Sequence, residues 1–375
     1  MFLLTLFSCG SEPAPAEEDG MTDLTVSLEA PSSGYRVVTD AFEVPPYAEV
    51  EICTVIRAEP HGDEVLGWFN RVETKSSEGS HHMNVMVSSM SFLDAFAGDG
   101  ASAAALGMEE GQYPCAELQY MESMFPVFPS QRAHQEITMP EGVAAPLLVP
   151  ALMVFSHHYV NPTDRTLRVN AAINFHTVPS DTIEEVASLV FDDIGTLEIP
   201  PASQLTASRT CVMERDVELA LVSTHTHQWG DCATLNHFDG EQVDAEPFFV
   251  NQLWETPPIL HFYPGEYSLS SGEGVHYACH YRNLSDQTIT NDGTADGEMC
   301  VFAGVVYPAT MSVSDIEDIV ASGDLAGLTQ LMGEAIGPCD THIEASSPWP
   351  LEDAALETSE SVCAGMEQTE SNTLQ

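Results

Sequence analysis

The chain has 375 residues, 43% of them hydrophobic, which is enough for one large β domain or two medium domains with packed cores. Its 58 Asp and Glu against 10 Lys and Arg give a net charge of −48. Such a surface repels nucleic acid and anionic lipid, which excludes both as partners. Two explanations of the charge stay open: adaptation to a salty medium, where counterions screen the self-repulsion, and simple solubility. No apolar run reaches the ~18 residues that a membrane-spanning helix needs.

The start of the chain predicts an export signal that ends at a cysteine. Residues 1–8 are apolar, and the run Leu6-Phe7-Ser8-Cys9 resembles a bacterial lipoprotein cleavage box, in which the cysteine is lipidated. The basic part of a signal peptide is missing, so a short apolar N-terminus without a role is the alternative. Removing Cys9 leaves an even number of cysteines, which favours a lipid anchor at Cys9 as the membrane attachment. Residues 11–23 are rich in Pro and acid and predict a flexible tether.

The remaining cysteines predict disulfides. They form an even set without C-x-x-C spacing, which favours disulfides over zinc knuckles and an oxidising, extracytoplasmic compartment. They are Cys53, Cys115, Cys211, Cys232, Cys279, Cys300, Cys339 and Cys363.

From about residue 24 the pattern predicts an all-β protein. Short runs of alternating or continuous apolar residues, separated by Gly and Pro turns without helical patterns between them, are typical of antiparallel sandwiches. We expect strands at 47–58, 84–88, 151–159, 167–176, 183–191, 208–215, 217–227, 246–254, 266–281 and 299–307. The irregular stretch 94–132 predicts a long loop or insertion.

Helical periodicity is confined to the end of the chain. Ser314 and Glu317 fit a capping box, and apolar residues from Leu325 to Met332 continue at helical spacing after Gly323. We expect a terminal helical pair on the second domain and a disordered polar tail beyond Cys363. A boundary near Val178-Pro179-Ser180 divides the chain into a signal and tether (1–23), a first β-sandwich (24–179), a second β-sandwich (180–310), and a helical extension with a polar tail (311–375).

Three histidine pairs lie at predicted strand ends. His225 and His227 are two apart, and residues two apart in a strand share a face, so both imidazoles can bind one metal ion. The pairs His81-His82 and His157-His158 are adjacent, and adjacent residues share a metal only where the strand turns or bulges. The irregular run 77–80 supplies such a start for the first pair. Taken singly, each pair also fits solvated or structural histidines.

Met299 begins a late predicted strand next to a cysteine. Taken singly, it fits an ordinary core residue. A thioether is a soft ligand that favours Cu(I) when imidazoles lie nearby. Imidazoles together with one thioether suit copper better than zinc or iron.

The order of these pieces resembles a known family. The motifs HHM at 81–83, HHY at 157–159, HTH at 225–227 and Glu298-Met299-Cys300 resemble the copper type II, ascorbate-dependent monooxygenases, which include peptidylglycine α-hydroxylating monooxygenase and dopamine β-monooxygenase. The resemblance covers roughly residues 45–310. It implies two consecutive antiparallel, jelly-roll-like β-sandwiches, each carrying one copper ion, that face each other across a cleft.

The resemblance also implies the ligands of both copper ions. His81, His82 and His158 would bind the electron-supplying copper, with His158 preferred to His157 because it directly precedes Tyr159. The second copper, where oxygen is activated, would be bound by the three predicted catalytic residues, His225, His227 and Met299.

Disulfide pairing follows in part from the same resemblance. It implies a bridge between Cys279 and Cys300 and, less directly, one between Cys53 and Cys115. The other four cysteines allow three pairings, among which the sequence does not choose.

The implied activity is hydroxylation of a C–H bond of a small organic substrate by O2, with ascorbate or a similar donor reducing the copper ions one electron at a time. Ser223 and Ala303 stand where peptide-amidating members carry an arginine and a tyrosine, so we do not predict peptide amidation. A non-catalytic, extracytoplasmic copper-binding lipoprotein and a purely structural β-sandwich module are the alternatives.

Overall fold

The computed structural model describes residues 17–18, 21–58, 66–88, 109–118, 124–149, 151–291, 297–324, 326–327, 330–331, 340–345, 349–350 and 363–372. Within these ranges most regular structure is β-strand, which confirms the predicted all-β sandwich fold. The helical segments there are α3 (Val313–Ser322), the 3-10 helices η1 (Cys115–Glu117) and η3 (Ser180–Thr182), and helical residues at 326–327 and 330–331.

The first half of the chain builds three sheets. The sheet that carries the first histidines has the order β8 (Gly111–Pro114), β5 (Glu49–Ala58), β12 (Ala151–Val160), β7 (Ser80–Ser88), β9 (Met124–Ser130). A second sheet has the order β15 (Glu185–Val186), β11 (Val143–Leu148), β6 (Leu66–Ser76), β14 (Ala171–Thr177), β3 (Gly34–Val38), with β10 (His134–Thr138) also paired to β6. A third, small sheet has the order β1 (Glu17–Glu18), β2 (Met21–Asp23), β13 (Thr166–Val169), β4 (Phe42–Val44).

The second half of the chain, from β16 onward, also forms three sheets among the described residues. The sheet that carries the second histidines has the order β16 (Ser188–Asp193), β26 (Val301–Tyr307), β19 (Val217–His225), β22 (Leu260–His261), with β23 (Ser268–Leu269) paired to β19. The facing sheet has the order β21 (Phe249–Asn251), β20 (Gly230–Phe238), β24 (Gly274–Asn283), β18 (Ser203–Val212), β27 (Asp340–Ala345), with β28 (Trp349–Pro350) also on β18. A ribbon of β17 (Glu198–Ile199) and β25 (Ile289–Thr290) completes this half.

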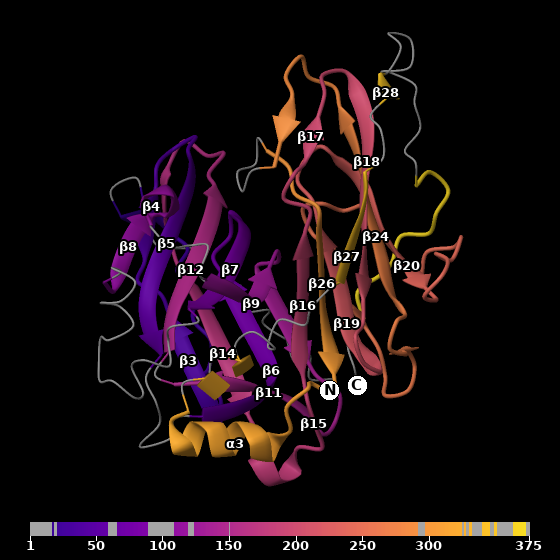
Figure 1. Ribbon diagram of the computed structural model, residues 1–375. Helices are drawn as coiled ribbons and strands as arrows, with labels where there is room; N and C mark the ends of the chain where they lie inside the picture. The colour runs from indigo at the N-terminus through magenta and orange to yellow at the C-terminus, as the bar shows by residue number, and fades with distance from the viewer. Residues whose placement is uncertain are drawn as a thin grey trace, which may run out of the picture.

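The two halves stand side by side (Figure 1), and buried hydrophobic residues of both pack together. One hydrophobic cluster runs from Val85 and Phe155 in the first half to Leu221 and Val305 in the second. The sheet of β19 and β26 therefore contributes one face to its own core and the other to the first half. Because an apolar interface resists relative movement, the histidine-bearing sheets of the two halves are held in a fixed relation.

The expected loop at 94–132 is wrong in part, because β8 and β9 lie within it. β9 pairs with β7 and contains Pro126 and Pro129. Proline removes a ladder donor and argues against a strand, but an edge strand tolerates it, and β9 is the edge of its sheet.

The expected start and packing of the terminal helix are also wrong. Its capping box joins Ser312 to Asp315, two residues before the predicted pair, and the helix ends at Gly323 in the left-handed conformation (φ 64°). Ile316 on α3 packs in one cluster with Trp68 and Val186, so α3 lies under the sheet that contains β6, β11 and β15 (Figure 1). After β26, the N–H of Ala309 donates a hydrogen bond to the carbonyl oxygen of Val186 on β15. This contact brings the helix to the surface formed by β11 and β15.

The predictions for the two termini have mixed outcomes. Cys9 and its lipoprotein box lie outside the described residues. The tether at 11–23 is wrong at its end, where Met21–Asp23 pairs with β13. The disordered tail predicted beyond Cys363 is wrong for residues 364–372, where Thr369 and Asn372 form hydrogen bonds with Val250 and His261.

None of the helices in the described part of the chain is long and apolar enough to cross a membrane.

The two implied disulfides, Cys53–Cys115 and Cys279–Cys300, are both present. A third bridge joins Cys232 to Cys363, and Cys211 is disulfide-bonded to a partner outside the described residues. Several disulfide bridges in one chain are typical of proteins that fold in an oxidising compartment.

Candidate metal centre

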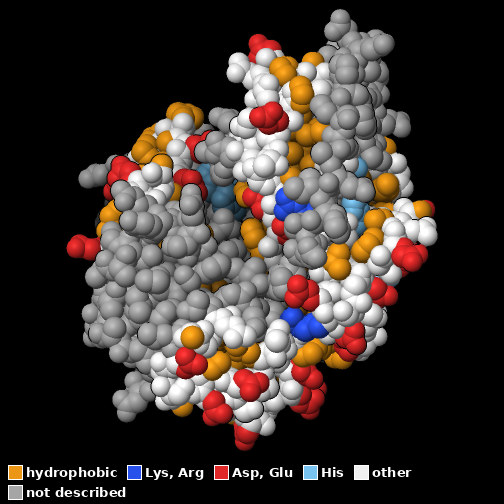
Figure 2. Space-filling model, in the orientation of Figure 1, with side chains coloured by type: hydrophobic (Ala, Val, Ile, Leu, Met, Phe, Trp, Pro, Cys, Tyr) orange, Lys and Arg blue, Asp and Glu red, His pale blue; other side chains and the backbone are white. Residues whose placement is uncertain are grey.

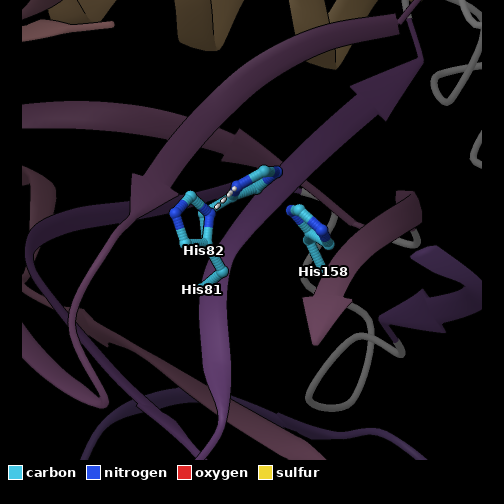
Figure 3. Close-up of side chains that lie close together, drawn as sticks. All are labelled: His81, His82 and His158. Atoms are coloured by element: carbon cyan, nitrogen blue, oxygen red, sulfur yellow. Dashed lines mark hydrogen bonds between the residues drawn. The ribbon is translucent and has the colours of Figure 1, made fainter. Parts of the chain in front are cut away.

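The first histidine group is built on two neighbouring strands. His82 on β7 lies directly opposite His158 on β12, and the register shifts next to this pair, so that His81 is the extra residue of a β-bulge. The bulge turns His81 to the same side of the sheet as His82 and His158. Without it, the adjacent residues His81 and His82 would face opposite sides. Ligand nitrogens of the three imidazoles all lie within 4.8 Å of one another, and the rings face each other (Figure 3). The group can therefore hold one metal ion.

Hydrogen bonds orient these rings. Nε2 of His158 donates to Oε1 of Glu49 at 2.6 Å, which leaves Nδ1 as the nitrogen with the lone pair. Nδ1 of His81 lies 3.1 Å from Nδ1 of His82, and Nε2 of His81 is buried without a hydrogen-bond partner. Three imidazoles whose nitrogens converge in this way are an arrangement that a metal ion could bridge.

His157 points away from this group. Its side chain is fully buried beside Phe42 and Phe155, and neither ring nitrogen has a hydrogen-bond partner. Burial lowers its pKa to about 3, so it is a neutral core residue. Successive residues of β12 face opposite sides, which places His158 in the group and His157 in the core.

The second histidine group lies where β19 ends. His225 is the last residue of β19 and His227 follows it in the turn towards β20, with ring centroids 4.9 Å apart. Nδ1 of His227 donates to the carbonyl oxygen of Gly297 at 3.2 Å, which fixes the tautomer with the lone pair on Nε2. The two imidazoles are thus side by side, as their spacing predicts, although only the first belongs to the strand.

Met299 is anchored next to this turn through its backbone. Its N–H donates to Oε2 of Glu298 at 3.0 Å, and the same oxygen accepts the N–H of His227 at 2.8 Å. Its carbonyl accepts the hydroxyl of Tyr281 at 2.8 Å, and the next residue, Cys300, is in a disulfide. These contacts bring the segment that carries the thioether to the segment that carries His227.

The two groups adjoin each other across the interface between the halves. The ring centroids of His82 and His225 are 6.2 Å apart. Trp254 of the second half packs against His81 with ring centroids 5.1 Å apart. Histidine side chains are visible in the hollow between the halves (Figure 2). The expected cleft is therefore narrow at the histidines, and the groups form one continuous cluster.

Burial favours the neutral form of His81, His82 and His225. Burial and the neighbouring His158 and His227 lower the pKa of His81 to about 4, and the pKa of His225 is lowered to about 3 by burial and the same kind of neighbours. The pKa of His82 is also held well below its usual value. Neutral imidazoles have the lone pairs that metal ions need, so the donor set fits a bound metal.

A second cluster of potential ligands is explained without a metal. Cys232, His280 and Cys363 lie close together, but the two cysteines form a disulfide and Nδ1 of His280 is 2.8 Å from the hydroxyl of Thr206.

Three residues of the site have no signal of their own in the sequence. Glu49 and Trp254 reach the first group from β5 and from the other half of the chain, and Glu298 is visible only as a neighbour of Met299. An acceptor for a ligand histidine is expected at metal sites, but the sequence does not say which carboxylate supplies it. No family model matches this sequence, and no curated protein matches it either.

Proposed function

We propose that the protein is a copper-dependent monooxygenase that hydroxylates a C–H bond of a small organic substrate with O2 and an ascorbate-like one-electron donor. The observation that carries the proposal is the meeting of two histidine groups, one from each half, with the backbone of Met299 tied to the second. Five imidazoles with one methionine favour copper over zinc or iron.

In this proposal each half holds one copper ion. His81, His82 and His158 would hold the first, with Glu49 keeping the proton of His158 on Nε2. His225, His227 and Met299 would hold the second, where the thioether favours the reduced metal. When bound, copper supplies one-electron chemistry between Cu(II) and Cu(I). The balance is R–H + O2 + 2 electrons + 2 protons → R–OH + water, with two donor molecules each giving one electron.

The surroundings of the second group argue against a peptide carboxylate as the substrate's binding handle. Ser223 and Ala303, the two departures from peptide-amidating enzymes, are directly opposite each other on β19 and β26. The hydroxyl of Ser223 is bound to the carbonyl of Pro258 at 2.8 Å. Neither residue supplies a cation at this position, so we propose hydroxylation without amidation.

We also propose that the protein acts outside the cytoplasm, as a secreted protein or as a lipoprotein anchored at Cys9. The disulfides support the compartment. The residues before Cys9 support the anchor.

The test is metal content and oxygen consumption of the purified protein. We expect two copper ions per chain after loading with Cu(II) and dialysis, a copper–sulfur contribution to X-ray absorption after reduction with ascorbate, and ascorbate-dependent oxygen consumption above that of free copper. His227→Ala should remove one copper ion and all turnover while the protein stays folded, whereas His237→Ala, outside both groups, should change neither.

Other results for copper content and oxygen consumption would support other functions. Two copper ions without oxygen consumption would indicate the non-catalytic copper-binding protein, which Ser223 and Ala303 also fit. No stoichiometric copper would indicate a structural module.

A further inference from the structure

We propose that Glu298 is the positioning residue that fixes His227 and Met299 relative to each other, and that it is not itself a metal ligand. This inference rests on the proposed copper site at His225, His227 and Met299. In this inference, the buried carboxylate holds together the segments of His227 and Met299, which are not paired in the sheet.

The carboxylate is enclosed and fully engaged with backbone groups. Its side chain is 0% exposed. Oε1 accepts the N–H of Trp229 at 2.7 Å, and Oε2 accepts those of His227 at 2.8 Å and of Met299 at 3.0 Å. The N–H of Gly230 also interacts with this carboxylate.

Three backbone donors occupy both oxygens of the group. A carboxylate offers about four lone-pair positions. Because both oxygens already accept backbone N–H groups, a metal ion could bind Glu298 only by competing with these donors. Its contribution is therefore to hold other residues in place.

The strand pairing explains why a clamp is needed here. The ladder between β19 and β26 ends at the pair His225–Val301. His227 and Met299 both lie beyond that pair, where no ladder hydrogen bond connects their segments. One hydrogen bond, from Nδ1 of His227 to the carbonyl oxygen of Gly297, connects the segments there. Glu298 adds a connection between the two backbones, because one of its oxygens accepts the N–H groups of both His227 and Met299.

The test replaces the carboxylate with its amide. In Glu298→Gln only one acceptor atom remains, and the new NH2 group faces N–H donors. We expect Cu(I) to bind the second group at least about tenfold more weakly, and the copper–sulfur contribution to X-ray absorption to disappear, while the first group keeps its copper. In the metal-free protein, the amides of His227 and Trp229 should exchange hydrogen faster than in the wild type.

The matched control is Asp239→Asn. Asp239 also accepts two backbone N–H groups, from Glu241 and Gln242, but in an exposed turn away from the histidines. This variant should keep two copper ions and the sulfur contribution. Loss of sulfur in both variants would overturn the assignment, since it would then not be specific to Glu298.

The outcomes separate this inference from the proposed function. Wild-type protein with two copper ions and sulfur, together with an unchanged Glu298→Gln variant, overturns only the role of Glu298. Wild-type protein without the second copper overturns the proposed function, and the role of Glu298 in copper binding with it. If Glu298→Gln does not fold, Glu298→Asp decides: its shorter carboxylate should weaken copper binding at least about tenfold, and wild-type affinity would overturn the proposal.

Discussion

The two histidine groups are built in different ways. The first lies within a regular sheet, where His82 and His158 are cross-strand partners and a single bulge adds His81. The second lies beyond the end of a strand pairing, where His227 is in a turn and Met299 precedes a strand. The sheet ladder positions the first group, whereas the second depends on a buried carboxylate and a disulfide.

This difference has a physical consequence. Ladder hydrogen bonds are repeated along β7 and β12, so the loss of one polar contact leaves the first group largely in place. The second group is held by only a few described contacts, and each contact positions a different segment. A single substitution at one of them should therefore disturb the geometry of the group.

The largest expected effect is the loss of the disulfide next to Met299. Replacing Cys279 and Cys300 with alanine should lower the free energy of unfolding by about 2–5 kcal/mol, measured by chemical denaturation. The bridge connects β24 to the segment before β26, so the copper–sulfur contribution should also disappear. Replacing Cys53 and Cys115, the bridge of the first half, should reduce stability but keep the sulfur contribution. If the sulfur contribution survives in both variants, the second group does not need its disulfide.

A smaller effect is expected in the turn after His227. A Cβ on Gly230 would lie 2.4 Å from Oγ1 of Thr226, which is 2% exposed and has little room to move. Gly230→Ala should therefore cost about 1–3 kcal/mol of stability and weaken copper binding at the second group alone, measured by denaturation and copper titration. Gly195→Ala is the control, because nothing lies within 4 Å of its new Cβ. Equal losses in the two variants would contradict the expectation.

The first group should respond to the removal of Glu49. Glu49→Ala takes away the acceptor for Nε2–H of His158, and we expect copper affinity at this group to fall about tenfold, by less than in Glu298→Gln, with little change in stability. Glu51→Ala is a matched control on the same strand, since Glu51 accepts from Ser156 and not from a histidine of the group. A fall in affinity larger than that of Glu298→Gln would reverse the contrast between the two groups.

The smallest effect concerns the contact between the halves. His261 is 2% exposed, and burial lowers its pKa to about 4 despite an interaction with the backbone of Thr138 in the first half. The unfolded chain therefore takes up a proton first as the pH falls below about 6.5, and stability is lost between about pH 6.5 and 4, by up to ~1.4 kcal/mol per pH unit.

Denaturation at pH 7 and pH 5 measures this loss. His261→Gln should lose about 1–2 kcal/mol less than the wild type over that interval. His134→Gln, at a side chain that is 59% exposed, should behave as the wild type does. Parallel losses in the wild type and His261→Gln would remove His261 as a pH-sensitive contact between the halves.

Local patterns were sufficient for much of the fold and for the choice of candidate ligands. Short apolar runs predicted the strands around His158 and His225, and the rule that adjacent histidines need a bulge matches the extra residue at His81. The resemblance to copper monooxygenases implied two disulfides that are present. The strand β9 was missed because its prolines, which an edge position tolerates, outweighed its apolar residues.

What the sequence by itself determined was the all-β class and the residues able to bind a metal, because strand alternation and ligand chemistry are properties of short segments. Only the tertiary structure decided which side chains support those ligands and that the two groups meet. Glu49 and His158 are 109 residues apart, and Glu298 and His227 are 71 apart. The packing of α3 against Trp68 likewise joins distant parts of the chain. Such contacts depend on sheet register and on the apolar interface between the halves, and no local period encodes either.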